Sequence, residues 1–376
     1  MRGRFEALSS ALKRRFVERD DVVDAALAAL VAGQHLLMIG PPGTAKSELA
    51  AAVCAALDGA RGFEWLLTRF TTPEELFGPI SLRALEADRY ERITAGKLPD
   101  AHVVFLDEVF KASSAILNAL LTVLAERKFH NGPRALDVPL VTLVGASNEL
   151  PDDEALEALY DRFLVRVVVD YIEADHRFLR LLTLGEPGPL PTLSLADLDA
   201  ARAAAATLPA SDQTLRDLVA LRTALRDEGV VASDRRWRQA LGFLRAWAWL
   251  RGRAVVGEAD LRALRHVLWS DPDERELVDA TIEALLGEEA ARMQALVFEA
   301  REFAAWPDDP SRRDPDERAR AALEARVKLD QLRGEGVGLV DAARRRGRDT
   351  DALDEMLAEI DRLRETLRRA LGSTLQ

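Results

Sequence analysis

Short apolar runs, separated by polar or glycine-rich turns, dominate the first half of the chain. Such runs are typical of buried strands when turn residues bound them. The predicted strands are Leu36–Ile39, His102–Leu106, Leu140–Gly145 and Leu164–Val169. The first run leads into Gly40–Gly43 and then into an alanine-rich helical pattern from Ser47 to Leu57. A strand, a tight turn and a helix in this order predict a parallel α/β sheet.

Helical periodicity fills much of the sequence between these runs. Residues 1–35 carry apolar positions at helical spacing, and Ser113–Arg127 places isoleucine and leucine side chains on one face. Within Lys128–Pro139, the pair Asn131-Gly132 is a hairpin turn signal. The segment from Phe77 to Pro99 is longer than a simple connection, so we expect an inserted helix or hairpin there.

The second half of the chain has a helical pattern throughout. A Gly/Pro-rich break at Gly185–Pro191 precedes it, and the helical pattern runs from Ser194 to about Leu286. A charged helical tail follows Trp306–Pro310, and we expect breaks in it at Gly334-Glu335-Gly336 and near Gly347. The predicted domains are an α/β domain at 1–186, an all-α lid domain at 192–286 and a helical C-terminal region at 287–376.

The last predicted helix carries an apolar seam at roughly heptad spacing. Its members are Leu353, Met356, Leu357, Ile360, Leu363, Leu367 and Leu371. Such a seam packs either on neighbouring helices of its own chain or in an intermolecular coiled coil. The sequence leaves both arrangements open.

Composition narrows the classes of function. The 376 residues fit two or three domains, and the net charge of −12 gives no basic face of the kind a dedicated nucleic-acid binder needs. The single cysteine, Cys54, cannot form an internal disulfide, and the five histidines lack metal-ligand spacing. No apolar run is long enough to span a membrane, and the N-terminus has no signal-peptide pattern. We expect a cytoplasmic protein, and the charge balance does not favour a nucleic-acid partner, although it leaves a local basic patch at a pore open.

The segment after the first predicted strand has the pattern of a phosphate-binding loop. Its residues are Gly40, Pro41, Pro42, Gly43, Thr44, Ala45, Lys46 and Ser47. Backbone N–H groups at a helix N-terminus favour phosphate oxygens, the Lys46 ammonium would reach the β- and γ-phosphates, and the Ser47 hydroxyl would hold Mg²⁺. Ala45 stands where the strict pattern has glycine, and its methyl group fits if φ is negative there. We therefore expect ATP and Mg²⁺ as cofactors.

Acidic and amide side chains follow the next two predicted strands. Asp107 and Glu108 end one strand, and Asn148 ends the other. Strand ends on this side face the ligand crevice of open α/β sheets. Asp107 would hold magnesium through water, Glu108 would orient and polarise the attacking water, and Asn148 would hold that water against the γ-phosphate. The alternatives are a helix N-cap for the acidic pair and a loop amide for Asn148.

Two arginines are candidates for stabilising transition-state charge. Arg162 lies just before the fourth predicted strand and has the position of an arginine finger offered to a neighbouring subunit. Arg235 follows a helix N-cap signal at Ser233-Asp234 and would contact phosphate from the helical domain, with Arg236 as the fallback. The alternative for Arg162 is a surface salt bridge. The alternative for Arg235 and Arg236 is a purely structural role without contact to phosphate.

Taken together, these motifs resemble the AAA+ ATPases of the MoxR group, most closely the RavA-like branch. The resemblance covers roughly residues 5–285, and its segments include Thr68–Ser81, Arg89–Pro99, Val104–Arg127, Ala146–Pro151, Leu156–Arg166 and Ala232–Trp237. It implies that Lys46 and Ser47 are Walker A residues, Asp107 and Glu108 Walker B, Asn148 sensor 1, Arg162 the arginine finger and Arg235 sensor 2. Val22 and Val23 are candidate contacts of the adenine base.

The family resemblance also implies an assembly and a task. It implies a ring, usually a homo-hexamer, with ATP bound between protomers. It further implies chaperone-like remodelling of an unidentified target protein, commonly with a von Willebrand A-domain (vWA) partner. The small β-rich domain of the RavA-like branch is not expected here, because no strand pattern occurs between Trp306 and Gln376. From family position, we expect the insertion Phe77–Pro99 to face the pore or the axial surface of the ring.

Three other functions are weighed against this one. A monomeric P-loop switch or GTPase is expected to carry an Asn-Lys-x-Asp signature that recognises guanine. The corresponding run here is Asn148-Glu149-Leu150-Pro151, which does not match it. A nucleotide-binding oligomeric scaffold with little hydrolysis remains open, because intact motifs do not guarantee turnover. A nucleic-acid motor has only the cluster Arg344-Arg345-Arg346 in its favour, and a solvated turn explains that cluster.

Overall fold

The computed structural model describes residues 1–151, 154–185, 188–308, 315–345 and 350–374. Its contacts divide the chain into two compact units. The sheet unit comprises Met1–Ser211, Ala232–Val256 and Ala263–Pro272, and the helical unit comprises Asp212–Val231, Gly257–Arg262 and Asp273–Gln376. Among the described residues, no helix has both the length and the apolar character needed to cross a membrane.

Five parallel strands form the core of the sheet unit, in the order β3-β4-β7-β1-β8. Their bounds are β1 Leu36–Ile39, β3 Gly62–Leu66, β4 Val103–Asp107, β7 Thr142–Ser147 and β8 Val165–Val168. All four residues of β1 are buried, because the strand has a neighbour on each side and helices cover the sheet. Double burial explains why the central strands have continuous apolar sequences. The predicted α/β class is confirmed, with a parallel sheet and a helical second half.

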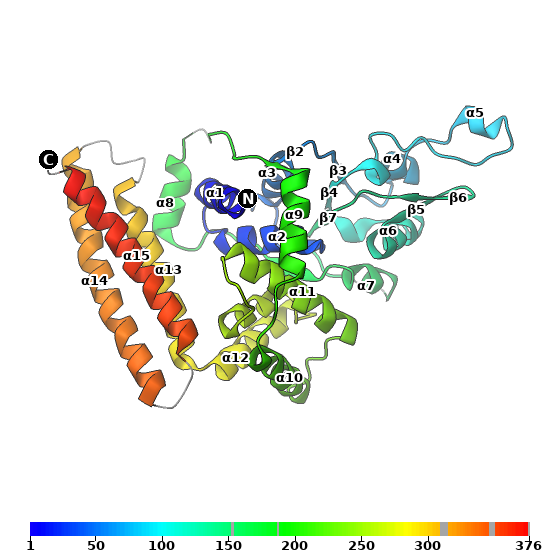
Figure 1. Ribbon diagram of the computed structural model, residues 1–376. Helices are drawn as coiled ribbons and strands as arrows, with labels where there is room; N and C mark the ends of the chain where they lie inside the picture. The colour runs from blue at the N-terminus through cyan, green and yellow to red at the C-terminus, as the bar shows by residue number, and fades with distance from the viewer. Residues whose placement is uncertain (152–153, 186–187, 309–314, 346–349, 375–376) are drawn as a thin grey trace. The chain divides into compact units, whose positions relative to one another are not determined.

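Helices cover this sheet and carry the chain between its strands (Figure 1). In the sheet unit they are α1 Arg2–Arg15, α2 Asp20–Ala32, α3 Lys46–Ala55, α4 Pro73–Phe77, α5 Leu82–Leu85, α6 Ser114–Glu126, α7 Glu154–Tyr160, α8 Asp175–Thr183, α9 Leu195–Ala206 and α11 Asp234–Leu250. Helix α11 packs on α2 and α9, and the Phe5 ring of α1 meets the Trp249 ring edge-on with centroids 5.4 Å apart. Two-residue strands β2 (Leu57–Asp58) and β9 (Leu193–Ser194) pair beside the main sheet.

The predicted insertion, Phe77–Pro99, extends away from the sheet and is called the excursion here. It contains one short helix, and the two chain segments on either side of that helix run antiparallel to each other. Helix α5 lies at its tip in Figure 1, and an antiparallel bridge joins Ile80 to Arg92. Next to it lies the hairpin of β5 (Lys128–Asn131) and β6 (Arg134–Asp137). Gly132, at φ +63°, sits in the hairpin turn, and a Cβ there would lie 2.1 Å from the Tyr90 carbonyl oxygen. Glycine therefore permits both the turn and the close approach of the excursion.

The helical unit contains a bundle of three mutually packed helices. The α-helices of this unit are α10 Asp212–Asp227, α12 Arg275–Leu286, α13 Glu288–Ala305, α14 Pro315–Arg345 and α15 Asp351–Thr374, and the last three form the bundle. Helix α15 packs on α13 and α14 of the same chain. Of the described seam residues, Leu353, Met356, Ile360 and Leu367 are buried, and Leu357 and Leu363 are partly buried. The seam thus packs within its own chain, which favours the first of the two arrangements left open by the sequence.

The expected break at Gly334-Glu335-Gly336 is wrong, because α14 runs through it without interruption. Gly336 allows the three helices to approach closely: a Cβ there would lie 3.0 Å from Leu357 Cδ1 and 3.3 Å from Met293 Sδ. The cost of glycine in a helix is thus offset here by packing. The second expected break, near Gly347, lies outside the described residues.

Contacts between residues do not separate the chain along the predicted domain boundaries. Helices α9 and α11 belong to the sheet unit, whereas the predicted lid domain spans 192–286. Part of the Gly/Pro-rich break at 185–191 lies outside the described residues. The boundaries 1–186, 192–286 and 287–376 therefore stay a prediction.

Candidate nucleotide site

The phosphate-loop segment connects the end of β1 to the start of α3. Its first glycine, Gly40, has φ +152°, and a Cβ there would lie 2.2 Å from the Val169 carbonyl oxygen. Gly43 has φ +79°. Gly40 is needed because a Cβ would collide with the neighbouring backbone. Both Gly40 and Gly43 also have positive φ angles that residues with a Cβ rarely adopt.

The backbone angle of Ala45 differs from the negative φ that the sequence analysis required for an alanine at this position. Its φ is +65°, in the left-handed region, so the condition of a negative φ is wrong. It directly precedes α3 and accepts the backbone hydrogen bond of Leu49 through its carbonyl. A left-handed alanine costs about 1–2 kcal/mol relative to a right-handed one. The loop therefore carries backbone strain at the residue that precedes Lys46, and such strain concentrates at functional sites.

The Lys46 side chain lies across the loop. Only 7% of the residue is exposed, and Nζ donates to the carbonyls of Gly40 at 2.6 Å and Pro41 at 2.7 Å. Burial lowers the pKa of Lys46, while the carboxylates of Asp107 and Glu108 oppose that shift. The Lys46 ammonium can attract phosphate oxygens, and the nearby carboxylates can attract a metal cation. The loop therefore has charges of both signs close to each other.

The ends of β4 and β7 bring three predicted residues together. Glu108 has φ +53°, and its N–H donates to Asp107 Oδ1 at 3.0 Å. Asn148 Nδ2 donates to Glu108 Oε1 at 2.8 Å, and Lys46 Nζ lies 3.5 Å from Asn148 Oδ1. Lys111 pairs with the other Glu108 oxygen at 3.2 Å. Lys46, Asn148 and Glu108 thus form one polar chain at the carboxyl end of the sheet.

The remaining predicted contacts lie on α2 and α3. Ser47 is in the first turn of α3 and is partly exposed. Val22 and Val23, the candidate adenine contacts, are buried in α2. Their contact with a base stays a prediction.

Arg19 is a further candidate site residue, which the sequence analysis did not name. It is 8% exposed and donates to the Asp170 carbonyl at 2.5 Å and the Glu18 carbonyl at 2.8 Å. Its charge also contributes to lowering the pKa of Lys46. Arg19 therefore places a third cation near the loop. No sequence signal separated it from the other arginines, because its acceptor at Asp170 lies 151 residues away.

Arg162 and Arg235 lie away from this cluster. Arg162 precedes β8, whose first residue Val165 pairs with Leu36 at the start of β1. The loop begins at Gly40, four residues further along, or about 13 Å at the usual strand rise. Arg235 forms an ion pair with Asp161, next to Arg162. The two arginines are therefore at the amino end of the sheet, opposite the cluster around Lys46.

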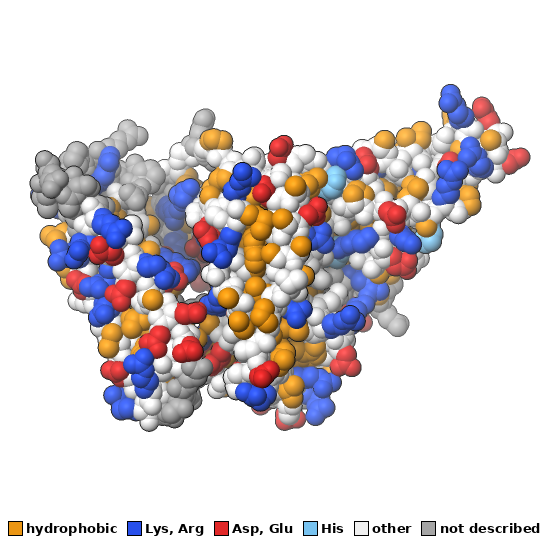
Figure 2. All heavy atoms as spheres, in the orientation of Figure 1, with side chains coloured by type: hydrophobic (Ala, Val, Ile, Leu, Met, Phe, Trp, Pro, Cys, Tyr) orange, Lys and Arg blue, Asp and Glu red, His pale blue; other side chains and the backbone are white. Residues whose placement is uncertain are grey.

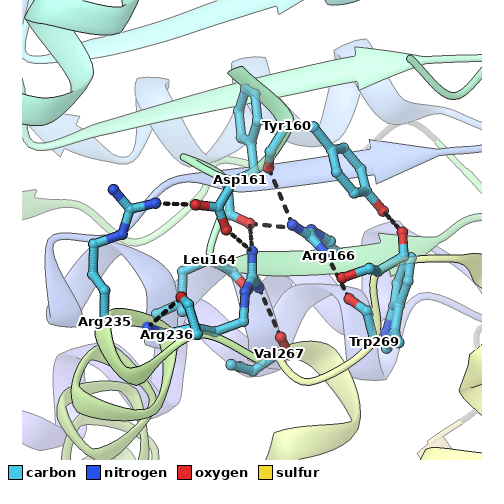
Figure 3. A network of polar contacts seen from close by, with 11 residues as sticks. Tyr160, Asp161, Leu164, Arg166, Arg235, Arg236, Val267 and Trp269 are labelled. Carbon is cyan, nitrogen blue, oxygen red and sulfur yellow. Dashed lines mark hydrogen bonds and ion pairs between the residues drawn. The ribbon is translucent and has the colours of Figure 1, made fainter. Parts of the chain in front are cut away.

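Two buried arginines hold the segment that contains Arg162 (Figure 3). Arg166 Nη2 donates to the Tyr160 carbonyl at 3.2 Å and Nη1 to the Trp269 carbonyl at 2.5 Å. Arg236 Nη1 donates to the carbonyls of Leu164 at 3.1 Å and Val267 at 2.7 Å. Arg236, the fallback phosphate contact, is 3% exposed and thus binds backbone inside its own chain.

Charges on the surface form no large field of one sign on the face seen in Figure 2, where Lys and Arg side chains are interspersed with Asp and Glu. This distribution agrees with the acidic but evenly charged sequence. It gives no support on that face to a nucleic-acid motor.

Comparison with known families identifies two matching segments. Residues 3–187 match the MoxR domain of the MoxR-vWA-beta-propeller ternary systems, and residues 213–282 match an AAA lid domain. An uncharacterised protein of Methanocaldococcus jannaschii is 42% identical over 271 residues, 72% of each chain. Chaperone MoxR1 of Mycobacterium tuberculosis is 29% identical over 193 residues, half of each chain.

A solved structure shares the fold at low sequence identity. The crystal structure of a provisionally assigned ATPase from Cytophaga hutchinsonii aligns with a TM-score of 0.61 and 17% identity. The alignment covers 76% of this chain and 94% of that protein. At this identity the similarity concerns the arrangement of strands and helices.

Proposed function

This chain belongs to the MoxR-type AAA+ ATPases, and from that premise we propose that it binds Mg-ATP and hydrolyses it to ADP and phosphate. The loop N–H groups and the start of α3 would receive the phosphates. A triphosphate offers the Lys46 ammonium stronger acceptors than the carbonyls of Gly40 and Pro41, which it contacts at 2.6 and 2.7 Å.

Ser47 and Asp107 are the residues that would hold magnesium. One is in the first turn of α3 and the other ends β4, so both lie at the carboxyl end of the sheet. Hydroxyl and carboxylate oxygens are the hard ligands that this ion prefers. The bound ion would neutralise charge on the phosphates.

The contact between Asn148 and Glu108 carries the proposal of hydrolysis. The 2.8 Å hydrogen bond fixes one oxygen of the Glu108 carboxylate, and Lys46 lies near the other end of the Asn148 amide. In our proposal, Glu108 polarises the attacking water and Asn148 positions it. Proton acceptance and positioning next to a phosphate-binding ammonium are what water attack on a phosphoanhydride requires.

We propose that a second copy of the chain completes each site. Arg162 and Arg235 lie at the amino end of the sheet, whereas Lys46 and Glu108 lie near its carboxyl end. This separation favours an arginine finger that acts on the nucleotide of a neighbour. A homo-hexameric ring would repeat such an interface around a closed axis.

The proposed task is to remodel or activate another protein. The matched MoxR domain is described from systems that also contain vWA and β-propeller components, so we propose a vWA protein as partner. The excursion exposes Leu82, Leu85, Tyr90 and Ile93, between 51% and 75% each, which supports a protein-binding role for the predicted insertion. The RavA-like branch, the cytoplasmic location and the domain boundaries remain predictions.

The test is ATP turnover and nucleotide binding in Glu108→Gln and Lys46→Ala variants, with Glu126→Gln as an exposed control. Glu108→Gln should bind a fluorescent ATP analogue but lose at least about 100-fold in kcat, because it loses a general base. Lys46→Ala should bind the analogue weakly. Normal turnover by Glu108→Gln would refute the assigned role, and wild-type binding without turnover would favour the scaffold function.

A further inference from the structure

Asp161 connects a buried arginine to an exposed one (Figure 3). Its Oδ1 accepts from Arg236 Nη2 at 3.3 Å, and its Oδ2 pairs with Arg235. The Arg236 side chain is 4% exposed, whereas that of Arg235 is 45% exposed. One partner is therefore held by the core, and the other faces solvent.

Arg236 fixes the position of the Asp161 carboxylate. Its remaining donors bind carbonyls of Phe163, Leu164 and Val267 at 2.7–3.3 Å. Burial lowers the pKa of Arg236 and the Asp161 carboxylate opposes that shift. If the buried guanidinium of Arg236 moved toward a ligand outside the chain, it would break its hydrogen bonds and leave the carbonyl acceptors unpaired. Asp161 is consequently a stable anchor for a third group.

Arg235 needs such an anchor. It lies in the first turn of α11, where the helix dipole disfavours a cation, and its long exposed side chain has many rotamers. The ion pair with Asp161 selects among them. Because Arg162 is the next residue after Asp161, this pair brings the Arg235 guanidinium to the segment that carries the proposed finger.

Arg162 itself has hydrogen-bonding capacity to spare. Its Nε is buried and has no hydrogen-bond partner among the described residues. The segment around it is held at the Tyr160, Phe163 and Leu164 carbonyls by the two buried arginines. The residue as a whole is partly exposed, so an anion from outside the chain would meet the part of the guanidinium beyond the buried Nε, on a backbone that is held in place.

We propose that Asp161 is a positioning residue that holds Arg235 beside Arg162, so that both guanidiniums meet the phosphates of a nucleotide bound by a second copy of this chain. This inference rests on the proposed function. An exposed ion pair contributes only about 0–1 kcal/mol to stability. Loss of Arg235 should therefore leave the fold intact, whereas loss of the Asp161 charge also weakens the contact with the buried Arg236. In both cases turnover should fall through the orientation of Arg235.

The experiment compares kcat, ATP affinity and Tm for Asp161→Asn, Arg235→Ala, their double variant and Asp161→Glu. Asp199→Asn is the control, because it removes another exposed aspartate near an arginine. Asp161→Asn and Arg235→Ala should each lower kcat about five- to tenfold with ATP affinity unchanged. Tm should be unchanged in Arg235→Ala and lower in Asp161→Asn, which also removes the carboxylate beside the buried Arg236. The double variant should be no slower than Arg235→Ala, and Asp161→Glu should recover much of the rate.

The outcomes separate this inference from the proposed function. If Arg235→Ala and Arg162→Ala are impaired but Asp161→Asn matches the control, the positioning role is wrong and the shared site stands. If Asp161→Asn lowers Tm together with kcat and Asp161→Glu does not restore the rate, the residue is only structural, which also overturns the inference. If Arg162→Ala and Arg235→Ala both turn over normally, the shared site itself fails.

Discussion

Two residues of the nucleotide site hold backbone angles that are unfavourable for any residue with a side chain. Ala45 has φ +65° and Glu108 has φ +53°. Ala45 directly precedes Lys46, and Glu108, itself the proposed catalytic carboxylate, directly follows Asp107. The surrounding fold must hold this strain, and strain of this kind often accompanies preorganised sites.

Replacing Ala45 by glycine should relieve the strain and stabilise the nucleotide-free protein by about 0.5–1 kcal/mol, after the larger unfolded-state entropy of glycine is subtracted. Denaturant titration followed by tryptophan fluorescence measures the change. Ala51→Gly, at an exposed site inside α3, should instead cost about 1 kcal/mol. A loss of stability in Ala45→Gly equal to that of the control would contradict the strain.

His35 predicts a pH dependence of stability. Burial lowers its pKa well below the usual value, and the Arg127 guanidinium lowers it further. The folded state thus keeps the imidazole neutral, while the unfolded state takes up a proton below about pH 6.5. Stability from this group is complete above that pH and is lost as the pH falls.

Between pH 7.5 and 5.5, the wild type should therefore lose about 1.4 kcal/mol more unfolding free energy than His35→Gln. Chemical denaturation at both pH values measures the difference. Equal losses in the two proteins would mean that His35 is protonated in the folded state.

At the residue scale, the sequence predicts the groups that follow strands or belong to a local motif. The residues of this kind are Lys46, Asp107, Glu108 and Asn148. The structure brings them together at the carboxyl end of the sheet. The role of Arg19 could not be predicted in this way, because its neighbours become visible only after the chain has folded. The left-handed φ of Ala45 also depends on the loop as a whole.

At the scale of elements, burial decides which strands can be predicted. The central strands β1, β4 and β7 are apolar on both faces, so their sequences are continuous apolar runs. The sequence analysis missed β3, which pairs only with β4 at the sheet edge and alternates exposed and partly buried residues. Its Glu64 and initial Gly62 are also uncommon strand residues.

Helix α14 was expected to break because glycine usually disfavours a helix. The three glycines of this helix predict different effects of alanine. Gly334 and Gly338 have open space where a Cβ would be, whereas a Cβ at Gly336 would meet Leu357 at 3.0 Å. Gly334→Ala and Gly338→Ala should each stabilise the bundle by about 0.5–1 kcal/mol.

Gly336→Ala should gain nothing or should destabilise, because Leu357 and Met293 must shift. Thermal unfolding of the three single variants gives the comparison. A gain at Gly336 as large as at Gly334 would contradict the close packing of α13, α14 and α15.

At the scale of the whole molecule, the side chains proposed to take part in ATP hydrolysis form two separate groups, and neither group is complete without the other. Lys46, Glu108 and Asn148 lie at the carboxyl end of the sheet, whereas Arg162 and Arg235 lie at its amino end. A single copy therefore separates the phosphate-binding groups from the arginines proposed to stabilise the transition state. Assembly of copies would unite the two sets and make turnover dependent on protein concentration.

The most direct test of this account is Mg-dependent ATP hydrolysis in Glu108→Gln, Arg162→Ala and an equimolar mixture of the two, over a range of protein concentrations. Each variant alone should be nearly inactive. The mixture should recover about a quarter of wild-type activity, since random assembly places an intact Glu108 beside an intact Arg162 at that fraction of interfaces. Wild-type turnover by Arg162→Ala, independent of concentration, would contradict the account and favour a site that works within one copy.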